Sequence, residues 1–226
     1  MTRKTIFIAS AVTLLLVFVV GVLLYTGQKE KVTETAMKKA ASQPVEINQA
    51  ALIRMHSPAM GKSDAPVVIV EFLDPACETC SAFYPMVKQL MAANPDSIRL
   101  VLRYAPFHKG SDKVVAVLEA ARRQGKFWPA LEALLINQPD WTQNHAAHVE
   151  RVWKHLGGIG LNMEQMAFDL TAPEIGNVIA QDLADAQTLK VNKTPEFFVN
   201  GKPLPSFGFE QLKALVNQAL ADHRTR

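Results

Sequence analysis

Cys77 and Cys80 are the only two cysteines in the 226-residue chain, and two residues separate them. They stand between a predicted strand and a predicted helix. The N–H groups and the dipole at the start of a helix stabilise a nearby anion, here the thiolate of Cys77. A thiolate is the nucleophilic form of cysteine and attacks disulfides. The spacing therefore predicts a redox dithiol, in which Cys77 attacks a disulfide and Cys80, one helical turn away, resolves the mixed disulfide.

Other uses of a cysteine pair fit the sequence less well. A zinc site usually has four ligands, and the chain has no second cysteine pair. Its six histidines are scattered: His56, His108, His145, His148, His155 and His223. A c-type haem site requires histidine directly after the second cysteine, where Ser81 stands. A structural disulfide across so short a loop would remove little chain entropy. A module that binds a soft metal such as copper through both thiolates stays open as an alternative.

The segments on either side of the dithiol predict the elements that hold it. Residues 65–73 form a nearly continuous apolar and β-branched run, which favours a buried central strand. A helix is predicted over residues 80–93 and a second strand over residues 97–104. A strand, a helix and a strand in this order form a βαβ unit with a parallel strand pair and a right-handed crossover.

Residues 109–190 are predicted to be mostly helical, with helices at 112–124, 127–136, 142–156, 162–170 and 174–189. A short strand follows at 196–199. Asn200-Gly201 is a strong hairpin signal, with a partner strand at 202–204, and a helix closes the chain at 209–221. Because the strand at 196–199 must return to the sheet that carries the dithiol, we expect the helical block to be an insertion beside the dithiol.

The N-terminal region predicts a membrane anchor. Residues 6–25 are uncharged and long enough to cross a bilayer as a helix. This run is longer than the apolar core of a signal peptide, which usually has about 7–15 residues. We therefore expect an anchor at residues 1–27, a linker at 28–60 and a folded domain at 61–226.

The location of the domain follows from its chemistry, because the basic residues on the two sides of the span are nearly balanced. An anchored redox dithiol suits the oxidising side of a membrane, so we expect a bacterial inner-membrane protein with its domain in the periplasm. The formal net charge of +3 gives no case for nucleic-acid binding, which needs a clustered basic face.

Two motifs more than 100 residues apart resemble the DsbA-like thiol–disulfide oxidoreductases of the thioredoxin superfamily. The first is Ala-Pro-Val-Val-Ile-Val-Glu-Phe-Leu-Asp-Pro-Ala-Cys-Glu-Thr-Cys at 65–80, followed by Pro85. The second is Lys-Thr-Pro-Glu-Phe-Phe-Val-Asn-Gly-Lys at 193–202. The resemblance covers about residues 61–221. It implies an α/β thioredoxin fold (βαβ–ββα) with an inserted helical subdomain at about 109–190.

The same resemblance implies dithiol–disulfide exchange in protein substrates, by oxidation or isomerisation. It implies no cofactor other than the redox-active Cys77–Cys80 disulfide. The implied partners are protein substrates with thiols or disulfides and a membrane redox protein that resets the dithiol.

The resemblance also assigns roles to single residues. Cys77 matches the exposed nucleophile and Cys80 its buried partner. Pro195 matches a cis-proline that lies against the dithiol and helps to bind substrate backbone, with Thr194 before it. Glu71 matches a buried acid six residues before the nucleophile. A carboxyl there with a raised pKa could shuttle the Cys80 proton.

One departure from the family pattern leaves the direction of electron flow open. The best-known oxidant of the family has histidine beside the second cysteine, whereas this chain has Glu78-Thr79 between its cysteines. The negative charge of Glu78 would oppose the thiolate. A dedicated disulfide reductase is therefore an alternative, and the reduction potential of the couple would discriminate between the two.

Overall fold

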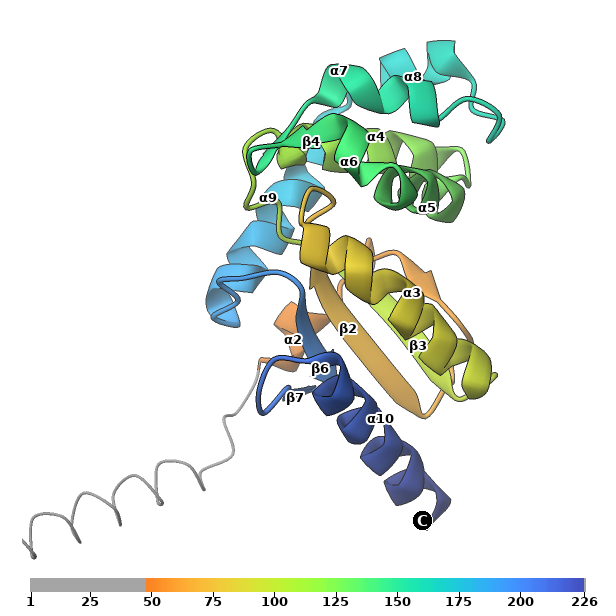
Figure 1. The fold of residues 1–226 in the computed structure, drawn as a ribbon, viewed down its shortest axis with the longest axis vertical. Helices are drawn as coiled ribbons and strands as arrows, with labels where there is room; N and C mark the ends of the chain where they lie inside the picture. Colours follow the sequence, from red (N-terminus) through yellow and green to blue (C-terminus); the bar gives the residue numbers. More distant parts are fainter. Residues whose placement is uncertain (1–47, 226) are drawn as a thin grey trace, which may run out of the picture. The chain divides into compact units, whose positions relative to one another are not determined.

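The computed structural model describes residues 48–225 of the chain (Figure 1). The anchor predicted at residues 1–27 and the linker up to residue 47 lie outside the described residues. Within residues 48–225, no helix is long and apolar enough to cross a membrane.

The centre of the fold is a five-stranded sheet with the strand order β1-β3-β2-β6-β7. Its strands are β1 (Ala59–Met60), β2 (Val67–Leu73), β3 (Ile98–Tyr104), β6 (Glu196–Val199) and β7 (Lys202–Pro203). β2 and β3 are parallel, with Val67 opposite Ile98, and β6 runs antiparallel to β2, with Glu71 opposite Phe197. The predicted βαβ unit and the predicted return of the chain after the helical block are confirmed.

Helices cover both faces of this sheet. Side chains of β2 alternate between the faces, as they do in any strand. Val67, Ile69 and Leu73 belong to the core under α3 (Glu78–Ala93) and α10 (Phe209–Arg224). Val70 and Phe72 belong to a smaller core under α2 (Gln49–Leu52) and α9 (Pro173–Thr188). This two-sided burial explains why the strand is apolar at nearly every position.

The inserted helices gather beyond one end of the sheet, near the start of α3 (Figure 1). They are α4 (Ser111–Arg123), α5 (Phe127–Ile136), α6 (Gln138–Trp141), α7 (Val149–Val152) and α8 (Met163–Asp169), with a 3₁₀ turn at Trp153–His155. α9 leads back from this group to the sheet, where it packs against β3 and α2. The predicted helix limits agree with these to within a few residues, except at 142–156.

The helix predicted over residues 142–156 is wrong in its first half. The chain forms a hairpin there, with β4 (Thr142–Gln143) antiparallel to β5 (Ala146–Ala147). Asn144 and His145 both have positive φ, 51° and 56°, as a two-residue hairpin turn requires. A residue outside the hairpin helps to fix its conformation, because the N–H of Ala147 donates to the carbonyl of Lys109 at 2.8 Å. A contact to a residue so distant in the sequence overrides local helix propensity.

The folded unit also begins before the boundary expected near Gly61. Within the described residues it includes α2, from Gln49, and β1, which pairs antiparallel with β3. Leu52 on α2 is 2% exposed and packs in the smaller core. The last part of the segment expected to be a linker is therefore folded. Its elements have four and two residues, too few to show a hydrophobic period.

Candidate functional site

The dithiol lies where β2 ends and α3 begins, as the sequence predicts. Cys77 is the N-cap residue of α3, in an extended conformation. The turn before it is held by Asp74, whose side chain accepts the N–H of Ala76 at 2.8 Å and whose carbonyl accepts that of Cys77 at 3.0 Å. Pro85 lies inside α3.

The two sulfurs have different surroundings. Both cysteines are unpaired thiols in the structure, and Cys77 is 5% exposed whereas Cys80 has no exposed surface. Cys77 is thus far less exposed than expected for a nucleophile, but it is the cysteine of the pair that keeps some exposed surface.

The same surroundings separate the pKa values of the two thiols. The pKa of Cys77 is lowered to about 5, first by a hydrogen bond from Cys80. Burial opposes this shift, and hydrogen bonds from Thr194 and from the N–H groups of Cys80 and Thr79 add to it. Burial and the interaction with Cys77 raise the pKa of Cys80 well above its usual value. Near neutral pH, Cys77 is therefore the thiolate and Cys80 holds a proton.

The predicted substrate-binding residues lie next to Cys77. The Thr194-Pro195 peptide bond is cis. The carbonyl oxygen of Thr194 lies 3.3 Å from the Cys77 sulfur and accepts its hydrogen bond when the thiol is protonated. Two segments 117 residues apart thus meet at the reactive sulfur.

Glu71 is a buried carboxyl group without a partner. It has no exposed surface, and neither carboxylate oxygen has a hydrogen-bond partner among the described residues. Burial, and then the negative charge of Cys77, raise the pKa of Glu71 to about 8. The charge of Glu71 in turn raises the pKa of Cys80. The structure thus confirms that Glu71 is buried with a raised pKa, and its role as a proton shuttle for Cys80 stays a prediction.

Asp74 and His108 are site residues that the sequence analysis did not identify. Asp74 is fully buried; it accepts hydrogen bonds from the Ser111 hydroxyl and the His108 N–H, and its Oδ2 lies 2.7 Å from Nδ1 of His108. Burial opposes protonation of His108, but Asp74 and the charges of Cys77 and Glu78 raise its pKa. A histidine therefore does accompany the thiolate, supplied by the loop after β3. The sequence offered one signal for this pair, namely that the polar residue Asp74 directly follows the buried strand β2.

Comparison with known proteins agrees with this geometry. The sequence model of a family described as Thioredoxin matches residues 54–218. The chain belongs to the thioredoxin family. A thioredoxin-like oxidoreductase from Silicibacter pomeroyi DSS-3 is 33% identical, with a TM-score of 0.66 over 77% of this chain and 98% of the other.

More distant members share the thioredoxin fold. The thiol–disulfide exchange protein alpha-DsbA2 from Wolbachia pipientis is 19% identical, with a TM-score of 0.64 over 84% of this chain and 97% of the other. The family match confirms the expected membership of the thioredoxin superfamily, and the Silicibacter pomeroyi protein, at 33% identity, is itself described as a thioredoxin-like oxidoreductase.

A curated relative has a quite different name. The Na(+)/H(+) antiporter NhaA of Herminiimonas arsenicoxydans is 32% identical over 167 residues. The match covers 74% of this chain but 26% of the antiporter, so the chain spans about a quarter of the length of that relative.

The helical insertion of this thioredoxin-family domain contacts the dithiol loop directly. The side-chain amide of Gln138 on α6 donates to the carbonyls of Pro75, at 2.7 Å, and Cys77, at 3.0 Å. The hydroxyl of Ser81 donates to the carbonyl of Leu135 on α5 at 2.9 Å. The two bonds from Gln138 satisfy carbonyls of the dithiol loop, and all three bonds hold the insertion against the start of α3.

Proposed function

We propose that the protein is a membrane-anchored oxidoreductase whose domain lies in the periplasm and catalyses dithiol–disulfide exchange in protein substrates, by oxidation or isomerisation. One observation carries this proposal. Cys77 lies at the start of α3 against the Thr194 carbonyl and keeps some exposed surface, whereas Cys80 keeps none. A substrate sulfur can therefore reach Cys77 only, which makes Cys77 the attacking thiol and Cys80 the resolving thiol.

In the oxidising direction, a substrate thiolate attacks the Cys77 sulfur of the Cys77–Cys80 disulfide. A substrate–Cys77 bond forms, the Cys77–Cys80 bond breaks, and Cys80 leaves as a thiolate. The proton for this sulfur comes in our proposal from Glu71, whose raised pKa of about 8 supports that role. A second substrate thiolate then attacks the substrate sulfur of the mixed disulfide, and Cys77 leaves as the stabilised thiolate. Two electrons pass from the substrate to the dithiol.

The surroundings support the remaining parts of this proposal. The cis Thr194-Pro195 bond lies next to the Cys77 sulfur, which supports a role for Thr194 and Pro195 in binding the backbone of an extended substrate. The dithiol itself is the redox group, so no further cofactor is needed. A membrane protein that carries an oxidised disulfide would reset the couple, and the uncharged run at residues 6–25 would hold both partners in one bilayer.

The assignment of the two sulfurs is tested by trapping mixed disulfides in cells. We expect Cys80→Ala to accumulate complexes with client proteins, because no thiol remains to resolve them. Cys77→Ala should accumulate almost none. Non-reducing gels of the two variants give the result, and a reductant should dissolve every complex. Equal trapping, or trapping by Cys77→Ala alone, would overturn the assignment.

The direction of electron flow is tested by equilibrating the couple in a glutathione buffer. Dithiol proteins of this superfamily range from about −270 to about −120 mV. A potential in the upper half of this range supports oxidation or isomerisation, and one near the lower end supports the reductase alternative. Cell fractionation tests the anchor, since the full-length protein should remain with the membranes.

A further inference from the structure

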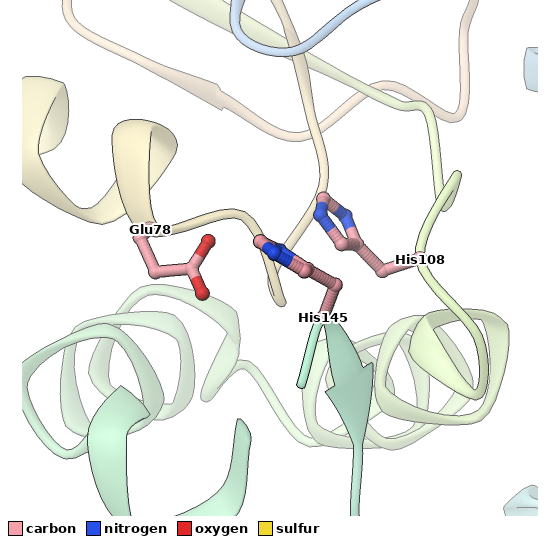
Figure 2. A group of neighbouring side chains, drawn as sticks. All are labelled: Glu78, His108 and His145. Carbon is pink, nitrogen blue, oxygen red and sulfur yellow. The ribbon is translucent and has the colours of Figure 1, made fainter. Parts of the chain in front are cut away.

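Three side chains that could ligate a metal ion converge beside the dithiol. They are Glu78 at the first position of α3, His108 in the loop after β3, and His145 in the β4–β5 turn. One potential ligand atom from each lies within 4.8 Å of the others. Figure 2 shows the carboxylate and the two imidazole rings pointing toward one another from three separate segments. This cluster contains neither cysteine and is distinct from the redox pair.

The backbone places the two histidines side by side. Lys109 and Ala146 form a parallel β-bridge, so the residues just before them, His108 and His145, are neighbours. Their rings stack with centroids 6.1 Å apart. The approach is close, since a Cβ on Gly110 would lie 2.8 Å from the Ala147 carbonyl oxygen. The hairpin that the sequence analysis missed is therefore the element that brings His145 to the site.

His108 is oriented as metal-binding histidines usually are. Its Nδ1 lies 2.7 Å from Oδ2 of Asp74, which is fully buried. A carboxylate on one ring nitrogen fixes the orientation of the imidazole and leaves the other nitrogen, Nε2, as the ligand. This contact is independent of the clustering and leaves Nε2 available as a ligand atom.

We propose that Glu78, His108 and His145 form a binding site for a divalent transition metal such as Zn²⁺ at the edge of the dithiol. Two imidazoles and a carboxylate are a ligand set that Zn²⁺ takes in open sites, with a fourth position free. Zinc–ligand bonds of about 2.1 Å put ligand atoms about 3.4 Å apart in a tetrahedral site. Glu78 and His145 are exposed, so rotation of their side chains can close the wider spacing of this cluster.

The site differs from a soft-metal module built on the thiolates, and the oxidised protein separates the two. Once Cys77 and Cys80 are joined in a disulfide, no thiolate remains to bind metal. We expect the oxidised full-length protein to bind one Zn²⁺ per chain in a competition titration with a chromogenic chelator. Oxidised protein that binds no Zn²⁺ would overturn the proposal.

The ligands are tested with variants that preserve the fold. Asparagine tolerates positive φ, so His145→Asn keeps the hairpin turn while it removes the imidazole. Glu78→Gln removes the charged ligand at an exposed position. We expect each variant to bind Zn²⁺ at least tenfold more weakly, and His148→Asn, three residues further on, to bind as the wild type does. Unchanged binding by both ligand variants, or equal weakening in the control, would contradict the proposal.

A second readout does not depend on affinity. Co²⁺ in a tetrahedral site gives intense visible absorption, and imidazole and carboxylate ligands leave it without the thiolate charge-transfer bands of a cysteine site. We expect such a spectrum from the oxidised wild type and its loss in His145→Asn. Because the experiment uses the disulfide form, its outcome is independent of whether the dithiol oxidises, isomerises or reduces substrates.

Discussion

The two faces of the sheet bury carboxyl groups in opposite ways. On the face of α3, Glu71 has no hydrogen-bond partner among the described residues. On the face of α9, Asp182 and Asp185 bind the buried guanidinium of Arg103 at 2.8 and 2.6 Å. A buried polar group without a partner lowers stability, whereas a paired one need not. The unpaired carboxyl lies beside the reactive sulfurs, so this protein gives up stability at its site of chemistry.

The paired region is a complete network. Arg103 also donates to the carbonyls of Ala51 and Leu52 on α2, and Arg54 donates to Asp185 at 2.6 and 2.8 Å. Burial opposes ionisation of Asp185, but the hydrogen bonds from Arg54 and Arg103 keep its pKa below the usual value. The network joins α2, β3 and α9, which makes it structural in its effect and explains why the chain before Gly61 is folded.

The largest effect is expected from breaking this network. Arg103→Met removes the fully buried cation that Asp182 and Asp185 share, while Arg54 stays paired with Asp185. Removing one partner of a buried ion pair costs up to about 3–5 kcal/mol. Urea unfolding of the variant measures the loss. Arg99→Met on the same strand is the matched control, because Arg99 makes one exposed bond to the Ser63 carbonyl and should cost under about 1 kcal/mol. Equal losses in the free energy of unfolding of the two variants would show that the network does not stabilise the fold more than a single exposed hydrogen bond does.

The opposite result is expected at Glu71, since Glu71→Gln should stabilise the reduced protein. The folded-state pKa is about 8, raised from 4.5 by burial first. The folded protein therefore holds an extra proton between these values, and stability falls as the pH rises from 4.5 to about 8. Glutamine removes this loss. The gain should be absent below pH 4.5 and reach up to about 3 kcal/mol at pH 7.

A second buried glutamate provides the control for that gain. Glu119 on α4 is 2% exposed, but it accepts the Tyr104 hydroxyl at 2.6 Å and pairs with Arg122 at 2.7 Å. Glu119→Gln should lose about 1.5–3 kcal/mol, because hydrogen bonds to a charged group are lost. Denaturant titrations of both variants at pH 4, 6 and 8 give the comparison. A gain at Glu71 that does not depend on pH would contradict the titration argument.

The smallest expected effect is a shift in the pKa of Cys77 when Cys80 is replaced. Alkylation of the reduced wild type should rise with pH through a midpoint of about 5 and then level off, since only the thiolate reacts. Cys80→Ala removes the hydrogen bond that lowers this pKa most, so the midpoint should rise by at least about one unit toward the ordinary value near 8.5. Glu71→Gln should leave it unchanged, because Glu71 is neutral at pH 5. Mass spectrometry of pH-quenched samples measures both, and a wild-type midpoint above about pH 8 would refute the assignment.

Elements with strong local signals were predictable from the sequence. The apolar run of β2, the Asn200-Gly201 turn and the periodic helices of the insertion appear in the structure at or near their predicted positions. Burial of Glu71 followed from the apolar residues around it. The elements that were not predicted are short, or their conformation is set by contacts with distant parts of the chain. They are α2, β1, α6 and the β4–β5 hairpin. Their conformations depend on distant partners, which a local pattern does not contain.

The sequence by itself determined the place of the cysteine pair before a helix, the βαβ unit around it and the β6–β7 hairpin, because each depends on residues close together in the chain. The tertiary structure alone decided that Glu71 has no hydrogen-bond partner within residues 48–225, and that Arg103 has a partner for each of its side-chain nitrogens. It also decided that Asp74, His108 and His145 meet at the edge of the dithiol. Contacts of this kind join segments tens of residues apart across loops. Their geometry depends on how the whole domain packs rather than on any local spacing.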